Sequence, residues 1–456
     1  MTTVALINPS TGETEETFPR FDDADRDALL DRAVTAQRAW RATPLEERAA
    51  VLRRTAALYR ERAEDLAGLI GREMGKLRRQ GLGELRIVAD IYDWYAEHAH
   101  ELLAPQELPA QGALRTFVRK DALGVVLGIM PWNFPYYQVA RWAAPNLLLG
   151  NALVLKHASL CPLSSQACED VLLDAGLPAH VFRNVRASGS QMADFIADPR
   201  IAAVSLTGSE EAGAAVAEVA GAHHKKSVLE LGGNDPFLVL DDHNLEKVLG
   251  RYVSARMANA GQACNAPKRL IVLAPFYERA LEFLRERIGA LPVGAWDDPD
   301  AKVGPLSSVE ARDEIVRRLA EGDATVVVGG RPLDRPGAFL EPTLLTDVDP
   351  ASDLGCNEIF GPVAILHRAA DVEEAVALAN DTDYGLGSYV FGSDLELAQE
   401  VASRMEAGMT YVNETGASRP GLPFGGIGRS GYGRELGEWG VDEFANLHLF
   451  RVSPAL

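Results

Sequence analysis

Apolar residues recur at helical spacing in the N-terminal part of the chain and at strand spacing after it. Residues 25–103 are rich in Ala, Leu, Glu and Arg, and their apolar positions predict helices. Residues 114–130 predict strands, and the segment 123–130 is almost continuously apolar. Such a run is typical of a strand covered on both faces, as in a parallel sheet.

The apolar strand pattern returns further along the chain. Residues 152–155 and 202–206 repeat it, and each is followed by a helix-like stretch. Strands that alternate with helices predict βαβ units and a doubly wound sheet. After Gly233 the alternation restarts. The later apolar runs are 237–240, 269–273 and 324–328. We therefore expect two α/β domains with a boundary near Gly233.

Two other apolar segments need separate interpretation. Residues 122–140 contain no charged residue and have the length of a membrane span. Pro131, Asn133 and other polar or helix-breaking residues interrupt the segment, and unpaired polar groups are expensive in lipid. It is better explained as a buried strand that runs into a loop. Residues 447–452 alternate like a strand, but the sequence shows no local partner for it.

The bulk properties narrow the class of protein. A chain of 456 residues exceeds one hydrophobic core, so two or more domains are expected. The net charge of −20 disfavours nucleic acid as a partner. The N-terminus lacks the pattern of a signal peptide, and no membrane contact is expected. Four cysteines without metal-ligand spacing indicate a reducing cytoplasm and no metal site. These are Cys161, Cys168, Cys264 and Cys356.

Three short motifs carry candidate chemistry. Cys264 lies among the small residues of 260–265, Glu230 lies between two leucines and before Gly232–Gly233, and Asn133 lies in 131–135. A thiol, a carboxylate and an amide are the nucleophile, base and oxyanion donor that covalent carbonyl chemistry requires. Each has a plainer alternative. A lone cysteine is usually a small buried hydrophobe, a Glu beside Leu is often an exposed strand residue, and an Asn is often a turn residue.

The order and spacing of these motifs resemble the NAD(P)-dependent aldehyde dehydrogenase superfamily over nearly the whole chain. Further matching landmarks are 8–12, 206–209, 358–362 and 423–426. Within the superfamily, residues 156–159 and 429–435 resemble bacterial succinate-semialdehyde dehydrogenases. The resemblance implies an α/β fold with a Rossmann-like cofactor domain, an α/β catalytic domain and a small β oligomerisation element, in a homodimer or homotetramer. The implied ranges are 1–111 with 131–232 for the cofactor domain, 233–432 for the catalytic domain, and 112–130 with 433–456 for the oligomerisation and bridging element.

The chain lacks a Gly-x-Gly-x-x-Gly dinucleotide fingerprint after an early strand. Residues 206–213 replace it, because they follow a strand and open a helix whose free N–H groups attract phosphate. Gly208 allows close approach and Ser209 can donate; the alternative is a plain N-cap, since Thr207 and Glu210 have capping-box spacing. The resemblance adds further cofactor contacts. These are Glu358 and Phe360 at the nicotinamide ribose, Lys156 and Ser159 near the adenosine ribose, and also Trp132 and Leu231.

Ser159 bears on the choice of cofactor. Many members of the superfamily place a Glu at this position, where it repels a 2′-phosphate. With Ser159 that repulsion is absent, so NADP is slightly favoured over NAD.

The resemblance also implies a mechanism. Cys264 attacks the aldehyde, the Asn133 amide and the Cys264 backbone N–H hold the oxyanion, hydride passes to the nicotinamide, and Glu230 activates water to release the acid. The leucines beside Glu230 should raise its pKa toward neutrality, which suits a general base.

The substrate assignment depends on Arg141, eight residues after Asn133. Members acting on succinate semialdehyde bind its distal carboxylate with an Arg at this offset, and Ser418 matches a second contact. The alternative is that Arg141 pairs with a core acid. Some members carry another Arg where this chain has Ala258, and Arg256 is two positions away. A broad aldehyde dehydrogenase, another semialdehyde dehydrogenase and a catalytically silent binding relative therefore stay open, although silent relatives typically lose the thiol or the base.

Overall fold

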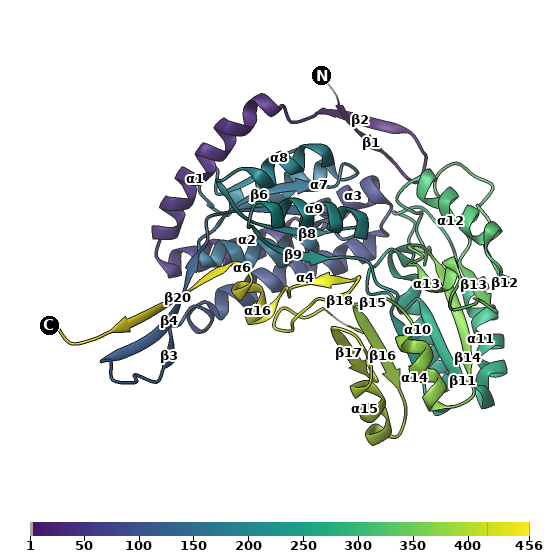
Figure 1. Cartoon of the computed structure of the whole chain (residues 1–456). Helices are drawn as coiled ribbons and strands as arrows, with labels where there is room; N and C mark the ends of the chain where they lie inside the picture. The colour runs from purple at the N-terminus through teal and green to yellow at the C-terminus, as the bar shows by residue number, and fades with distance from the viewer. Residues whose placement is uncertain (1–2, 417, 456) are drawn as a thin grey trace.

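The computed structural model describes residues 3–416 and 418–455. Two open α/β sheets and a projecting β arm make up the chain, with N-terminal helices packed against the first sheet (Figure 1). The helices predicted for 25–103 are present. They are α1 (Arg26–Ala42), α2 (Leu45–Glu61), α3 (Ala63–Met74), α4 (Arg78–Glu97) and α5 (Ala99–Leu102). A hairpin of β1 (Thr3–Ile7) and β2 (Thr14–Pro19) precedes them.

The first sheet has six strands in the order β19-β9-β8-β5-β6-β7, and all are parallel except β19. Its strands are β5 (Val125–Met130), β6 (Ala152–His157), β7 (Phe182–Asn184), β8 (Ile201–Thr207), β9 (Lys226–Glu230) and β19 (Gly431–Tyr432). The accompanying helices are α6 (Pro135–Leu149), α7 (Pro162–Asp174), α8 (Met192–Ala197) and α9 (Glu210–Ala222). The predicted apolar strands and the βαβ alternation are confirmed, and β5 is buried along its whole length.

Helix α6 follows the 131–135 loop and carries Arg141. It begins with Pro135 at a position where the missing N–H is not needed, and it ends at Gly150 with a left-handed φ of 101°. Every residue of α6 is buried, so the helix is a fixed support for the loop at its N-terminus.

The second sheet has seven strands in the order β12-β13-β14-β11-β10-β16-β17, with only the β12–β13 pair antiparallel. Its strands are β10 (Pro236–Val239), β11 (Arg269–Leu273), β12 (Thr325–Val328), β13 (Thr343–Thr346), β14 (Val363–Ala369), β16 (Gly387–Phe391) and β17 (Met409–Val412). Its helices are α10 (Leu245–Met257), α11 (Tyr277–Gly289), α12 (Val309–Glu321), α13 (Asp353–Cys356), α14 (Val372–Asn380) and α15 (Leu395–Ser403). The restart of the α/β pattern after Gly233 is therefore confirmed.

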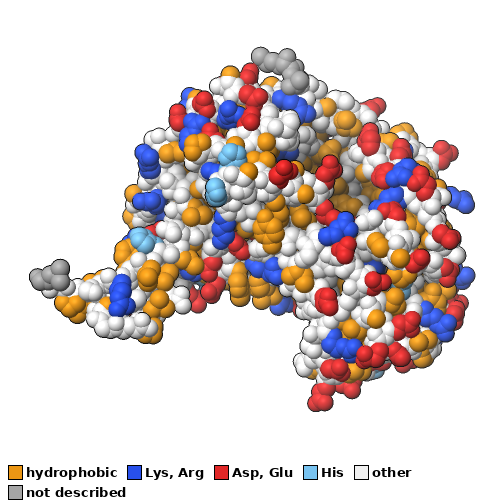
Figure 2. Space-filling model, viewed as in Figure 1, with side chains coloured by type: hydrophobic (Ala, Val, Ile, Leu, Met, Phe, Trp, Pro, Cys, Tyr) orange, Lys and Arg blue, Asp and Glu red, His pale blue; other side chains and the backbone are white. Residues whose placement is uncertain are grey.

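The arm is an antiparallel sheet of β3 (Gln106–Leu108), β4 (Arg115–Ala122) and β20 (Ala445–Val452). The C-terminal strand thus has a partner within its own chain, since Ala445–Val452 pairs with Arg115–Ala122 in full register; the sequence did not reveal it because the two strands are far apart along the chain. Figure 2 shows hydrophobic side chains on the arm, and Leu447 and Leu449 are more than half exposed.

Two short segments depart from the division expected from the sequence. Strand β5 lies within 112–130, and β19 lies at the end of 233–432, yet both belong to the six-stranded sheet. The reason is backbone pairing: β5 bonds to β6 and β8, and β19 closes the edge beside β9. Two further short strands, β15 (Tyr384–Gly385) and β18 (Ile427–Gly428), form an antiparallel pair. Helix α16 (Gly437–Asp442) follows β19 in the chain.

Within the described residues, no helix is both long enough and apolar enough to cross a bilayer. The segment 122–140 is divided between β4, β5 and α6 and is interrupted by the loop at 131–134.

Candidate active site

A cavity of about 290 Å³ brings most of the predicted site residues together. It lies where the loops after β5, β8 and β9 meet two loops of the second sheet. The predicted residues that line it are Trp132, Asn133, Gly208, Ser209, Leu231, Cys264, Glu358 and Phe360. Pockets of this kind, with few polar groups in a mainly apolar lining, are typical ligand sites.

A tight left-handed turn presents the Cys264 thiol. Asn259, Ala260 and Gly261 have φ values of 52°, 53° and 72° directly before it. Burial raises the pKa of the Cys264 thiol to about 12, and the nearby Arg141 and Lys268 cations oppose that rise. The resting thiol is therefore protonated at neutral pH, and its attack on a carbonyl requires a base.

The Gly232–Gly233 pair is required by close packing against this turn. A Cβ at Gly233 would lie 2.6 Å from the Cys264 carbonyl oxygen, and a Cβ at Gly232 would lie 2.7 Å from Glu358 Oε2. A larger residue at Gly233 would displace the turn that carries Cys264 (the thiol loop), and a larger residue at Gly232 would displace the Glu358 side chain.

Asn133 is buried and bonded to the turn that carries the thiol. Its Nδ2 donates to Gln262 O at 3.1 Å, and its backbone oxygen accepts from Asn259 Nδ2 at 2.9 Å. A side-chain amide has two N–H groups, so one donor remains for a ligand. The interpretation of Asn133 as only a turn residue does not account for this burial.

Glu230 is 2% exposed, so the alternative of an exposed strand residue is wrong. Neither of its carboxylate oxygens has a hydrogen-bond partner among the described residues. Burial raises the pKa of Glu230 well above its usual range, Arg141 opposes the rise, and Glu435 adds to it. A Cβ at Gly425 would lie 2.7 Å from Glu230 Oε1, so this glycine leaves room for the carboxyl group.

Arg141 combines the two interpretations that the sequence left open. Its side chain is fully buried, and its Nε lies 2.6 Å from Glu435 Oε2. The guanidinium also lies over the rings of Tyr137 and Phe424, at 5.0 and 4.2 Å. Among the described residues, Nη1 and Nη2 have no hydrogen-bond partner. The core acid therefore occupies only one side of the guanidinium, and two donor groups remain.

Ser418 lies beside the Tyr137 hydroxyl, as Arg141 does. Burial raises the pKa of the Tyr137 hydroxyl, and Arg141 and Ser418 beside it oppose that rise. Arg419 is exposed and pairs with Glu414 at 2.8 Å. Arg256 is fully buried and donates to four backbone oxygens, so it does not replace the cation missing at Ala258.

Lys268 is a site residue that the sequence motifs did not indicate. Its Nζ lies 2.8 Å from Glu358 Oε1 and donates to the backbone oxygens of Ala263 and Cys264. Glu358 is therefore anchored to the thiol loop rather than solvated. Beside it the rings of Phe360 and Trp132 meet edge to face, with centroids 5.7 Å apart. The only available signal was a lysine four residues after the thiol.

The phosphate-binding candidate is the N-terminus of α9. Ser209 is its N-cap and accepts from Ala212 N at 3.3 Å, so the alternative of a capping box that begins at Thr207 is wrong. The Ser209 hydroxyl keeps its own hydrogen to donate.

Lys156 and Ser159 lie outside the cavity at Cys264. Ser159 lines a smaller pocket with Arg186, and both burial and the nearby Arg20 lower the pKa of Lys156. The geometry therefore separates these two residues from the thiol, as expected for opposite ends of a dinucleotide.

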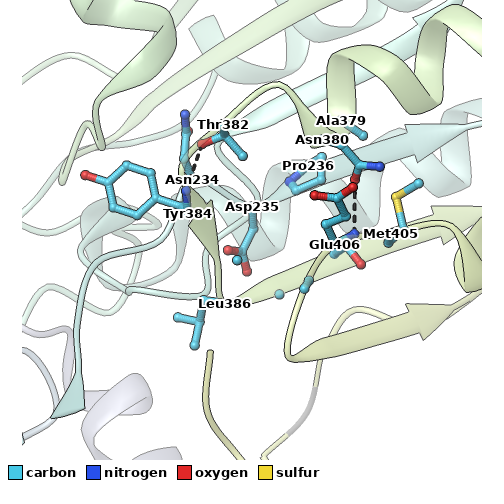
Figure 3. Close-up of a pocket in the computed structure, with 14 residues that line it drawn as sticks. Asn234, Asp235, Pro236, Ala379, Asn380, Thr382, Tyr384, Leu386, Met405 and Glu406 are labelled. Atoms are coloured by element: carbon cyan, nitrogen blue, oxygen red, sulfur yellow. Dashed lines mark hydrogen bonds between the residues drawn. The ribbon is translucent and has the colours of Figure 1, made fainter. Parts of the chain in front are cut away.

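A second small cavity shares no lining residue with the cavity at Cys264. It has a volume of about 10 Å³, which is room for one water, and Figure 3 shows Asp235 among Asn234, Pro236 and Leu386. Asp235 is 1% exposed, and burial raises its pKa to about 7. Throughout the described part of the chain, no group of three or more His, Cys, Asp or Glu side chains is placed to hold a metal ion.

Comparison with known proteins agrees with this geometry. The aldehyde dehydrogenase family model matches residues 1–449. Succinate-semialdehyde dehydrogenase [NADP(+)] of Deinococcus radiodurans is 47% identical, over 99% of this chain and 95% of that protein. Its counterpart in Mycobacterium avium is 42% identical, over 97% and 95%.

A solved structure gives the same result for the fold. Succinic semialdehyde dehydrogenase from Streptococcus pyogenes, in complex with NADP+, superposes with a TM-score of 0.96 at 40% identity, over 99% of this chain and 100% of that one. The predicted fold class and the resemblance identified from the motifs are both confirmed. The chain belongs to the aldehyde dehydrogenase family and is an NAD(P)-dependent oxidoreductase.

Proposed function

We propose that this protein oxidises succinate semialdehyde to succinate with NADP+, through a thioester on Cys264. The proposal depends on the burial of Arg141 and on the two Nη groups of its side chain that have no hydrogen-bond partner among the described residues. A fully buried guanidinium with two unpartnered Nη groups is costly unless an anion completes it. A short aldehyde with a distal carboxylate supplies that anion.

The chain's own groups account for the first half of the reaction. The Cys264 thiol loses its proton to solvent water before it attacks the aldehyde carbon, and the nearby Arg141 and Lys268 cations favour the thiolate. The free N–H of Asn133 donates to the oxyanion that forms on the aldehyde oxygen. One such donor is worth about 3–4 kcal/mol of barrier in other enzymes.

The cavity fits a nicotinamide, because the Trp132 and Phe360 rings and the small residues Gly208 and Gly232 leave a mostly apolar space beside the thiol. When bound, the nicotinamide accepts the hydride. Glu230 then deprotonates the water that hydrolyses the thioester; its raised pKa makes it a stronger base than a surface carboxylate, and its unpartnered oxygens leave it free to accept the proton.

The preference for NADP is supported by Ser159 and Lys156. Ser159 is exposed and carries no charge, and Arg186 lines the same pocket. This environment favours a 2′-phosphate, which a Glu at position 159 would repel. The relatives named above are NADP(+) enzymes.

We also propose a homodimer or homotetramer in a reducing cytoplasm. The exposed leucines of the arm, Leu447 and Leu449, and the free edge of β20 suit a second copy of the chain. All four cysteines are free thiols. The assignment of separate cofactor, catalytic and bridging domains remains part of this proposal.

A second candidate, a broad aldehyde dehydrogenase, is favoured by the ion pair between Arg141 and Glu435, which gives Arg141 a structural partner. One experiment separates the two. Formation of reduced cofactor is followed at its absorbance band with succinate semialdehyde, butyraldehyde and benzaldehyde, each with NADP+ and with NAD+. The proposal expects the highest kcat/KM for succinate semialdehyde with NADP+. Similar values for all three aldehydes would support the broad enzyme, and no turnover with any would support a silent relative.

A further inference from the structure

Three charged side chains from one stretch of the N-terminal helices lie buried beneath the loops of the site. Glu73 is in the last turn of α3, Lys76 follows it in the α3–α4 loop, and Glu84 is in α4. Their exposed fractions are only 0%, 2% and 3%. The proposed mechanism assigns none of them a chemical step.

Lys76 and Glu84 form an ion pair whose side chains are both fully buried. The other oxygen of the carboxylate, Glu84 Oε1, accepts from Tyr136 N at 2.9 Å and from Tyr137 N at 3.1 Å. These N–H groups are in the first turn of α6, where a helix has no internal acceptors. Glu84 therefore caps the helix that begins directly after the loop of Asn133, and its negative charge suits the helix N-terminus.

Lys76 holds the same loop through a side chain. Its Nζ lies 3.7 Å from the centroid of the Phe134 ring, within the range of a cation–π contact. Phe134 directly follows Asn133. The pair thus fixes the chain immediately after Asn133 at two points, a ring and a pair of backbone N–H groups. The backbone oxygen of Asn133 accepts a further hydrogen bond from Asn259 Nδ2 at 2.9 Å.

Glu73 caps a second helix, α7, in the way that Glu84 caps α6. Its carboxylate accepts from Leu163 N, Ser164 N and Ser164 Oγ at the start of α7. This helix follows the loop that carries Ser159. One short stretch of the chain therefore caps the helices behind two adjacent loops of the site.

Stability alone does not explain a buried ion pair. Removing two charges from water costs several kcal/mol each, and well-packed apolar residues of similar volume are often as stable or more so. What an apolar pair cannot do is accept two backbone N–H groups at one fixed point. What the Lys76–Glu84 pair provides beyond stability is therefore a fixed position for the loop at 131–134.

We propose that the Lys76–Glu84 pair positions Asn133 and thereby sets the rate of thioester formation. The inference depends on the proposed function in one respect, namely that Asn133 donates to the oxyanion. Lys76 and Glu84 are positioning residues, because they act only through Asn133. A displacement of about 1 Å at such a donor costs up to about 100-fold in rate.

The test is a double-mutant cycle between this pair and Asn133, read by single-turnover formation of NADPH. The variant K76M/E84M removes both charges and the acceptor. We expect it to lower the single-turnover rate constant by about 10- to 100-fold. NADP+ affinity, measured by fluorescence titration, should change by less than about 2-fold, because the proposed phosphate and adenosine contacts at Gly208, Ser209 and Lys156 lie in other segments of the chain. Arg60→Met, which breaks an exposed ion pair with Asp93 of α4, is the matched control and should leave the rate unchanged.

The same change in the Asn133→Ala background decides the question. If the pair acts through Asn133, K76M/E84M lowers the rate by no more than about 2-fold once the amide is gone. The variant K76M/E84Q, which keeps an oxygen for the two N–H groups, should recover most of the wild-type rate. If K76M/E84M does not fold, Phe134→Leu, which removes the ring that Lys76 contacts, carries the cycle in its place. Equal losses in both backgrounds, or an unchanged rate in K76M/E84M, would overturn the inference.

Failure of the proposed function gives a different result. If the wild-type enzyme does not oxidise succinate semialdehyde, the same cycle is run with the best aldehyde from the panel. The ratio of the two losses still tests the positioning role.

Discussion

Arg141→Leu removes the guanidinium and keeps an apolar side chain of moderate bulk. If Arg141 binds the distal carboxylate of succinate semialdehyde, the substrate loses a desolvated, charge-assisted partner. Such a loss is worth about 2–4 kcal/mol, or roughly 30- to 1000-fold in kcat/KM. Butyraldehyde has the same chain length and no carboxylate, so it should lose little.

The structure adds two effects that both aldehydes share. Arg141 opposes the rise that burial causes in the pKa of Glu230, so its removal raises that pKa further, leaves less of Glu230 ionised and slows hydrolysis of the thioester. Its removal also leaves Glu435 as a buried carboxyl group without its cation, which costs stability until the group protonates. The variant R141L/E435Q is the matched control, because it removes the cation and leaves no unpaired charge.

The assay measures kcat/KM for both aldehydes at saturating NADP+, with the thermal midpoint of each variant recorded alongside. The informative quantity is the ratio between the two aldehydes, in which the shared effects cancel. We expect that ratio to fall by at least about 30-fold in both variants. Equal losses for the two aldehydes would make Arg141 a structural partner of Glu435 and would refute the substrate assignment.

Three other changes test separate parts of the account. Glu230→Gln should leave a pre-steady-state burst of NADPH and slow the steady state by about 100-fold or more, since hydrolysis loses its base; an unchanged steady-state rate would remove Glu230 from the mechanism. Ser159→Glu should shift the ratio of kcat/KM values toward NAD+ by about 1–3 kcal/mol, through repulsion of the 2′-phosphate; a constant ratio would place Ser159 away from that phosphate. Burial raises the pKa of Asp235 from 3.8 to about 7, so the folded state holds a proton that the unfolded chain has lost. The stability that this proton confers is complete below pH 3.8 and is lost as pH rises through 7. Asp235→Asn should therefore flatten the fall of the thermal midpoint between pH 5 and 8, and an unaltered profile would contradict the buried, protonated state.

Local patterns in the sequence were sufficient to find the parts of the site that belong to one short segment. Cys264, Asn133, Glu358 and Phe360 each lie in a turn that follows or precedes a strand, so the fold brings them to one edge. The apolar runs predicted the strands of both sheets for the same reason, since burial on two faces leaves a continuous signal.

The contacts missed by sequence reasoning depend on residues far apart in the chain. Glu435 reaches Arg141 because β19 returns to the first sheet, and no local pattern marks that return. Lys268 folds back onto the thiol loop through a long side chain whose direction the sequence does not specify. Ser209 rather than Thr207 is the N-cap of α9, because strand β8 extends through Thr207. Residue propensities do not determine the last residue of a strand this closely.

The partner of β20 was missed on similar grounds. Its alternating residues predict a strand, but its pairing is set by register with β4, which lies far earlier in the chain. The arm forms only when residues 445–452 return to residues 115–122.

Direct detection of the covalent intermediate tests the central claim most closely. Glu230→Gln enzyme is mixed with NADP+ and succinate semialdehyde, quenched in acid during turnover, digested and analysed by mass spectrometry. The account predicts a succinyl adduct on the peptide that contains Cys264, and no adduct on peptides with Cys161, Cys168 or Cys356. NADPH formed without an adduct on Cys264, or with one on another cysteine, would contradict it.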